Sequence, residues 1–173
     1  KYFEESDYFR HYMGLLNSER LNQILEKYDL EVNFYLHAKF QEYADTFKSI
    51  SKRIHLISFG EVAVNEMLMR CRMLITDYSS VCWDILYQDK PSLFYQFDIE
   101  KYNEAHGSYI DMETELFGDR AATQEQLLDY LEETVQNDFR LKPEYEKMRG
   151  EYLQFKDHEH SRHICEEIKK RFH

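Results

Sequence analysis

The chain is 173 residues long, with 43% hydrophobic and 16% aromatic residues and a formal net charge of -11. This apolar content excludes a disordered chain, and the length suits one domain with a sizeable core. The negative charge repels phosphate backbones and so excludes broad nucleic-acid binding, although one local pocket can still hold a phosphate.

Strands and helices alternate in the first half of the chain. Apolar residues at helical spacing predict a helix over 21–28, and the apolar run that follows predicts a strand over 32–36. The pattern then repeats as a strand over 54–57, a helix over 64–71 and a strand over 73–76.

A further helix follows the segment 77–80 and ends at Lys90-Pro91, before a strand over 92–95. Strands separated by helices need right-handed crossover connections, which give a parallel sheet covered on both faces. The sequence therefore predicts one doubly wound, mainly parallel α/β domain over residues 1–173, with no repeat or linker that would divide it.

The second half begins with an aromatic and acidic segment. Residues 96–118 lack periodicity and are longer than a structural connection needs, so they are a candidate functional loop. Thr123 and Gln126 predict a capping box for the next helix, and Pro143 can open another. A last helix is predicted with three apolar residues on one face: Ile164, Ile168 and Phe172.

Cysteine usage and hydropathy indicate the compartment. Cys71, Cys82 and Cys165 are odd in number and lack CxxC spacing, as in cytosolic proteins with reduced thiols. No apolar run approaches the roughly 18 residues of a membrane span, and residues 1–10 lack the core of a signal peptide. The sequence therefore predicts a soluble cytoplasmic chain.

The first candidate site lies where the strand over 73–76 ends and a helix begins. Ligands bind at the carboxyl ends of strands in an open α/β sheet. Asp77, Ser79 and Ser80 fall there, and the N–H groups of a helix start together with two hydroxyls suit a phosphate or diphosphate. The alternative is that Asp77 or Ser79 only caps the helix, and the residues themselves leave both interpretations open.

Two other positions carry related chemistry. His37 follows the strand over 32–36, where an imidazole can hydrogen-bond a phosphate oxygen or carry protons. Asp111 and Glu113, in the loop over 107–113, can hold sugar or glycerol hydroxyls. A structural histidine and a solvated loop are the alternatives.

The histidine-rich segment 157–163 does not predict a metal site. His160 and His163 are three residues apart on a predicted helix, but the segment matches no standard zinc spacing. The sequence also lacks GxGxxG, the Walker loop, GxSxG and paired CxxC, which are the common nucleotide and hydrolase signatures. Composition and pattern alone therefore reach an α/β domain with a candidate phosphate site.

Several ordered pieces of the chain resemble the CDP-glycerol glycerophosphotransferase family of wall teichoic-acid synthesis. The resemblance rests on LITDYSSV over 74–81 and DKPSLFY over 89–95. Further family features follow in the same order: Leu36-His37 for an HP strand end, Asp84, Asp98 and Tyr102, the run 107–111, and Gly118. Three positions depart from the family pattern and leave the polymer open between wall teichoic acid, capsule and lipopolysaccharide: Ala38, Ser108 and Phe117.

The resemblance implies a GT-B architecture, in which two Rossmann-like domains enclose the active site. This chain is similar to the C-terminal, donor-binding domain, and the acceptor domain would lie outside residues 1–173. The implied reaction transfers glycerol phosphate from CDP-glycerol to a hydroxyl of a lipid-linked glycerophosphate or glycan acceptor and releases CMP. No metal or other cofactor is implied, and the whole enzyme would be peripheral at the inner face of the cell membrane.

The resemblance also implies roles for the candidate residues. The pair Ser79-Ser80, with Asp77, would hold the diphosphate of the donor. His37 would be catalytic and donate to the diphosphate or the departing CMP, while Asp111 or Glu113 would orient glycerol or ribose hydroxyls. The general base would belong to the acceptor domain.

Two other functions fit the same fold. One is a GT-B glycosyltransferase that uses a nucleotide sugar as donor. The other is a non-catalytic nucleotide-binding module with a degenerate pocket, to which the departure at Ala38 points.

Overall fold

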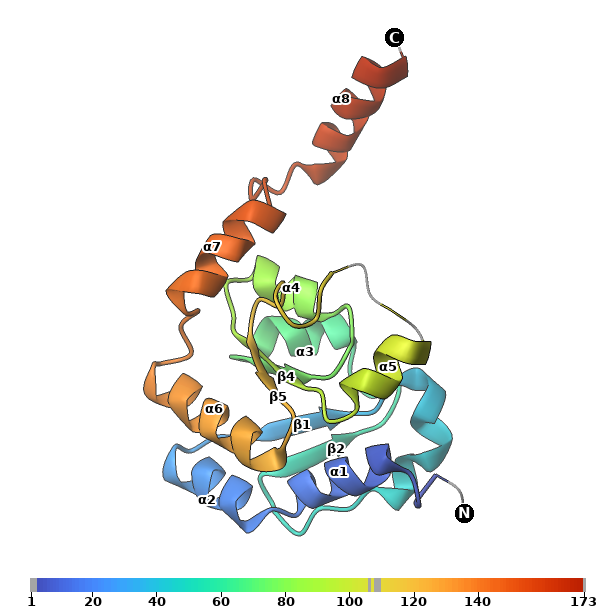
Figure 1. Ribbon diagram of the computed structural model, residues 1–173, viewed down its shortest axis with the longest axis vertical. Helices are drawn as coiled ribbons and strands as arrows, with labels where there is room; N and C mark the ends of the chain where they lie inside the picture. The colour runs from blue at the N-terminus through green and yellow to red at the C-terminus, as the bar shows by residue number, and fades with distance from the viewer. Residues whose placement is uncertain (1–2, 106, 108–109, 173) are drawn as a thin grey trace.

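The computed structural model describes residues 3–105, 107 and 110–172, in which helices and short strands alternate (Figure 1). The elements in chain order are α1 Asp7–Leu16, α2 Glu19–Lys27, β1 Val32–Tyr35, the 3-10 helix η1 Ala38–Thr46, β2 Ile54–Ile57, α3 Val64–Arg70, β3 Leu74–Thr76, α4 Cys82–Tyr87, β4 Ser92–Tyr95, α5 Ile99–Ala105, β5 Asp119–Ala121, α6 Gln124–Gln136, α7 Pro143–Tyr152 and α8 His160–Phe172.

All strand pairs in the described residues are parallel, but they form two ladders instead of the single sheet predicted. One ladder pairs β1 with β2, and the other has the order β3-β4-β5. Strands of three or four residues make few ladder hydrogen bonds, so the two ladders are joined by side chains. Residues of both, such as Phe34 and Ile75, pack against the same core cluster.

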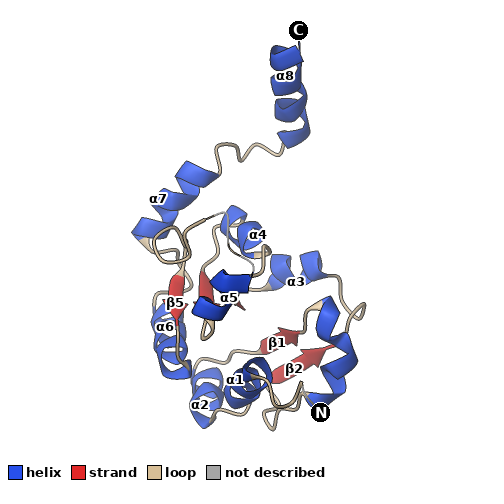
Figure 2. Cartoon of the chain, turned by 45° about the vertical axis from the view of Figure 1, so that its right-hand side comes forward, coloured by secondary structure: helices blue, strands red, loops and turns tan. Residues whose placement is uncertain are grey.

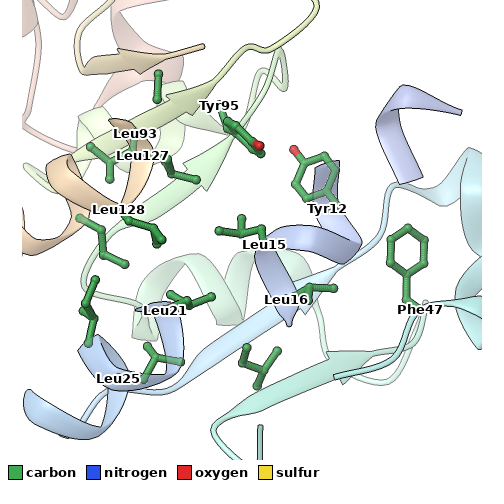
Figure 3. Packing of buried hydrophobic residues seen from close by; sticks show 14 of the residues in the cluster. Tyr12, Leu15, Leu16, Leu21, Leu25, Phe47, Leu93, Tyr95, Leu127 and Leu128 are labelled. Carbon is green, nitrogen blue, oxygen red and sulfur yellow. The ribbon is translucent and has the colours of Figure 1, made fainter. Parts of the chain in front are cut away.

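Helices cover both faces of β4, which confirms the doubly wound α/β class. Leu93 and Tyr95 point to one face and Phe94 to the other, so the strand is buried throughout. On the first face they meet a cluster drawn from α1, α2 and α6 (Figure 3), in which each fully buried leucine contributes roughly 1.5–3 kcal/mol. On the second face Phe94 meets Cys82 and Leu86 of α4 and two residues that precede β5, Leu116 and Phe117.

The helix starts follow the capping signals. The Thr123 hydroxyl accepts from the N–H of Gln126, as the capping box predicts, although the Gln126 side chain accepts from Ala122 one residue before the cap. Pro143 is the first residue of α7, as predicted.

Four elements were not predicted from the sequence. The first is α1, which is capped by Ser6 and buries Tyr12, Leu15 and Leu16 at helical spacing. The 3-10 helix η1, the helix α5 and the three-residue strand β5 are the others, and the last two lie at the ends of the segment interpreted as a loop. No residue of α5 is buried, which explains why its sequence shows no apolar periodicity.

The last helix forms, but its apolar face does not pack on the body of the protein. In Figures 1 and 2, α7 and α8 lead away from the strands toward the C-terminus. Ile164 and Phe172 are 59% and 80% exposed. Among the described residues, no helix is long and apolar enough to cross a bilayer.

Candidate functional site

The candidate site lies at the carboxyl ends of β3 and β4, where residues 77–81 and 96–98 leave the ladder. α4 begins at Cys82, so Ser79 and Ser80 precede its first turn instead of lying within it. The residue at the cap position is Val81, and no side chain caps α4. The interpretation of Asp77 or Ser79 as a simple helix cap is therefore wrong.

The loop from Asp77 to Val81 presents hydrogen-bond donors that the protein does not use. Across residues 3–105, 107 and 110–172, the N–H groups of Ser79, Ser80 and Val81 have no protein acceptor, and the two serine hydroxyls have no partner. The backbone oxygens of the two serines are occupied, since Ser79 O accepts from Cys82 N at 3.3 Å and Ser80 O accepts from Trp83 N at 3.1 Å. Residues 79–81 therefore offer N–H and O–H donors that no described residue uses, and an anion can accept hydrogen bonds from them.

The Asp77 carboxylate is turned into the protein. Its Oδ1 accepts from the N–H of Tyr78 at 2.7 Å, and its Oδ2 lies 3.5 Å from the Tyr12 hydroxyl of α1. Burial, followed by the charge of Asp77, raises the pKa of Tyr12 well above its usual value, so the phenol stays neutral and can donate. Asp77 thus shapes the loop that carries Ser79 and Ser80.

A buried glutamine connects this loop to the segment around Asp111. Gln96 follows β4 directly and is 1% exposed. Its Nε2 donates to the backbone oxygen of Asp77 at 3.0 Å and lies 3.7 Å from the Met112 sulfur. Gln96 is not among the residues predicted from the sequence, although a polar residue directly after the apolar run Leu93-Phe94-Tyr95 is a signal that could identify it.

Asp111 and Glu113 are both exposed, and they flank Met112, whose sulfur contacts Gln96. The Asp111 Oδ1 accepts from the N–H of Glu113 at 2.7 Å, and Glu115 accepts from the N–H of Asp111 at 2.6 Å. The backbone N–H of Glu113 and the Thr114 hydroxyl hold the pKa of Asp111 below its usual value. The Asp111 carboxylate therefore closes a turn. Ser108, one of the three departures from the family pattern, lies outside the described residues.

His37 belongs to the other ladder. It is exposed, two residues after the end of β1, and its backbone oxygen accepts from Phe40 N at 2.8 Å. A pocket of about 280 Å³ opens nearby, between these strand ends and η1. Its lining does not include the serine pair and consists of Phe34, Leu36, Ala44, Asp45, Phe47, Lys48, Leu56, Ile57 and Ser58. The structure thus brings Asp77, Ser79 and Ser80 beside the Asp111 loop through Gln96, and places His37 at a separate strand end.

The histidines near the C-terminus have other partners. The His160 ring is 3.0 Å from the Tyr87 hydroxyl, and His163 lies 2.7 Å from an Asp157 oxygen. Within the part of the chain that the structure describes, no group of three or more metal-ligating side chains comes together.

Comparison with known proteins places these features in context. Residues 4–170 match the family model of the CDP-Glycerol:Poly(glycerophosphate) glycerophosphotransferases. The minor teichoic acid biosynthesis protein GgaB of Bacillus subtilis is 27% identical over 90% of this chain and 17% of its own length. The teichoic acid glycerol-phosphate transferase of Staphylococcus aureus is 27% identical over 82% of this chain and 34% of its own length.

A solved structure shows the same fold. The wall teichoic acid polymerase TagF matches 92% of this chain with a TM-score of 0.65 at 21% identity, over 39% of the TagF chain. The chain therefore spans well under two thirds of the length of the curated relatives and of this structure.

Proposed function

The chain belongs to the CDP-glycerol:poly(glycerophosphate) glycerophosphotransferase family, and from this membership we propose that it binds the donor in a glycerophosphate transfer. The donor is CDP-glycerol, and the acceptor is a hydroxyl of a lipid-linked glycerophosphate or glycan. The transfer takes place at the inner face of the cell membrane, in the synthesis of teichoic acid or a related surface polymer. It needs no metal or other cofactor.

In this reaction the acceptor oxygen forms a bond to the β-phosphorus of CDP-glycerol, and the bond from that phosphorus to the bridging oxygen breaks. CMP leaves with the bonding electron pair, and the acceptor hydroxyl gives its proton to a base in the rest of the enzyme. The donor site must therefore hold two phosphates and stabilise the charge that moves onto the departing CMP.

One observation carries the proposal: three N–H groups and two hydroxyls of the loop 79–81 have no acceptor within the described residues. Diphosphate oxygens accept hydrogen bonds and cannot donate them, so this loop matches them in chemistry. The argument rests on these donors and not on a helix dipole, because α4 has only six residues.

The remaining candidates take roles that suit their positions. Asp77 is negatively charged and would repel a diphosphate, so it contributes by shaping the loop through its bond to Tyr78 N. His37 donates to the diphosphate or the departing CMP from the end of β1. Asp111 and Glu113 orient glycerol or ribose hydroxyls from the exposed loop beside Met112.

Calorimetric titration with CDP-glycerol, CDP, CMP and UDP-glucose tests the proposal. The double substitution Ser79→Ala with Ser80→Ala is expected to weaken CDP-glycerol binding by roughly 2 to 4 kcal/mol, because both hydroxyls bond to charged oxygens. Ser161→Ala, at an exposed site on α8, is the control and should bind as the unaltered chain does.

The titration also separates the alternatives. Tighter binding of UDP-glucose than of CDP-glycerol would indicate a nucleotide-sugar glycosyltransferase. Unchanged affinity in a folded double variant would remove the site from the loop 79–81, and absence of binding at millimolar CDP-glycerol would contradict the proposal for this chain.

A further inference from the structure

Tyr78 stands in the middle of the loop that carries the serine pair, and its side chain is held at two points. Its hydroxyl donates to Asp98 Oδ1 at 2.8 Å. Its ring is stacked on Tyr102, with centroids 3.5 Å apart and planes 5° from parallel. Both contacts join residues 20 or more positions apart, so they fix the loop relative to another part of the chain.

The two partners of Tyr78 come from the start of α5. Asp98 immediately precedes the helix, and its backbone oxygen accepts from Tyr102 N at 3.0 Å. Residues four apart lie on one face of a helix, so α5 presents an acceptor and a ring together. α5 buries no residue of its own, and the contacts of Asp98 and Tyr102 with Tyr78 join it to the loop that follows β3.

The hydrogen bond between Tyr78 and Asp98 persists throughout the neutral pH range, because the phenol keeps the proton that it donates. Burial, and then the bond to Asp98, raises the pKa of Tyr78, so the phenol keeps its proton throughout the neutral range. No Lys, Arg or His nitrogen of the described residues lies within 4.0 Å of the Asp98 carboxylate. The phenol is therefore the donor on which this carboxylate depends.

We propose that Tyr78, Asp98 and Tyr102 are positioning residues that hold the loop 77–81 in the conformation that binds the diphosphate. They act through the backbone and touch no ligand themselves. A loop that is ordered in advance loses less conformational entropy on binding, and so binds more tightly. The inference rests on the proposed function, because it names the residues that prepare the same site.

Tyr78→Phe tests the hydrogen bond while keeping the stacked ring. We expect the dissociation constant for CDP-glycerol to rise about five- to tenfold, the effect of about one hydrogen bond. Tyr102→Leu, which removes the stacked ring, should have a similar effect, whereas Tyr102→Phe keeps the ring and should restore affinity.

The chain offers a matched control. Tyr145 donates to Asp119 Oδ1 at 2.9 Å, and this tyrosine-to-aspartate bond lies at the amino end of β5, away from the loop. Tyr145→Phe should destabilise folding about as much as Tyr78→Phe and leave the affinity for CDP-glycerol unchanged. Equal changes of affinity in the two variants, or unaltered affinity in Tyr78→Phe and Tyr102→Leu, would overturn the inference.

A second measurement keeps the inference separate from the proposed function. Backbone NMR order parameters of residues 77–81 should fall in Tyr78→Phe and not in Tyr145→Phe, with or without a ligand. If the unaltered chain does not bind CDP-glycerol, the proposed function fails, but the order parameters still show whether Tyr78, Asp98 and Tyr102 hold the loop 77–81 in place. Order parameters that Tyr78→Phe leaves unchanged would overturn it.

Discussion

At both ends of the β3-β4-β5 ladder, aspartate carboxylates accept hydrogen bonds from tyrosine hydroxyls, but the two ends differ in charge. At the amino end, Asp119 accepts from Tyr145 and also pairs with the Lys142 ammonium at 2.8 Å. At the carboxyl end, Asp77 and Asp98 accept from Tyr12 and Tyr78, and no cationic nitrogen of the described residues lies within 4.0 Å of either.

The two ends also differ in the room and the hydrogen-bond donors that they offer to a ligand. The amino-end cavity holds about 10 Å³, room for about one water molecule, and Ser92 Oγ is buried there without a protein partner. At the carboxyl end, the N–H groups of residues 79–81 remain available. The charged groups at the amino end pair with one another and stabilise the fold, whereas the loop at the carboxyl end keeps N–H donors that no described residue uses.

Among the substitutions at the amino end of the ladder, Gly118→Ala should cause the largest loss in the free energy of unfolding. A Cβ there would lie 2.1 Å from the Ser92 backbone oxygen and 2.9 Å from the Phe94 ring, so β4 and β5 would have to separate locally. We expect a loss of about 3 kcal/mol in the free energy of unfolding, at the upper end of the range for overpacking, measured by urea titration.

Gly150→Ala is the matched control for that substitution. Nothing lies within 4 Å of the added methyl, and the position is inside α7, where alanine is favoured over glycine by about 1 kcal/mol. If the two variants had similar unfolding free energies, the close approach at Gly118 would not be what holds the amino end together.

Asp119→Ala should have the next largest effect on stability. It removes the nearer of the two carboxylates that pair with the Lys142 ammonium, which is 22% exposed, and leaves Glu133 at 3.0 Å; it also removes the acceptor of Tyr145. We expect a loss of about 2 kcal/mol in the free energy of unfolding, below the value for a fully buried pair. Affinity for CDP-glycerol should be unchanged, since the pair lies at the opposite end from the loop.

A surface ion pair gives the comparison for Asp119. Asp138 lies 2.8 Å from Arg72, with side chains 70% and 59% exposed, and Asp138→Ala should cost less than about 1 kcal/mol. An Asp119→Ala variant that is as stable as Asp138→Ala, or one that loses ligand affinity, would contradict the division between the two ends.

Much of this architecture is readable from the sequence because it depends on local patterns. The strands over 54–57 and 92–95 fall where the apolar runs predict them, and the segment 77–80 at a strand end is a local feature. Gln96 and Tyr12 act through contacts with Asp77 that span 19 and 65 positions, which no local pattern encodes. The roles of the candidate residues stay predictions, since ligand binding depends on groups brought together by the fold.

The errors have physical causes too. The segment 96–118 has the pattern of a loop because α5, which lies within it, buries none of its residues, and β5, which follows it, has only three residues. The periodicity of α8 correctly predicts a helix, but amphipathicity does not say what covers Ile164 or Phe172. The sequence predicts one sheet, whereas the strands form two ladders, because the order of strands along the chain does not determine which of them pair.

The alkylation rate of the Cys82 thiol should report small changes in structure at the carboxyl end of the ladder. Cys82 is the first residue of α4 and is 7% exposed, and its backbone N–H donates to the backbone oxygen of Ser79 at 3.3 Å. Burial raises the pKa of the Cys82 thiol to about 11. Because only the thiolate reacts, alkylation at pH 8 should be on the order of 100-fold slower than at the exposed Cys165, and should accelerate as the pH rises toward 11.

Loosening the loop should expose this thiol slightly. We expect Tyr78→Phe to raise the rate of Cys82 alkylation, followed by peptide mass spectrometry, about two- to fivefold, because the loop is hydrogen-bonded to the start of α4 through Ser79 O. Tyr145→Phe, which removes the equivalent bond at the amino end, should leave that rate unchanged although it weakens folding by a similar amount. Equal acceleration in both variants would mean that Cys82 reports global stability, and that the two ends of the ladder are not independent.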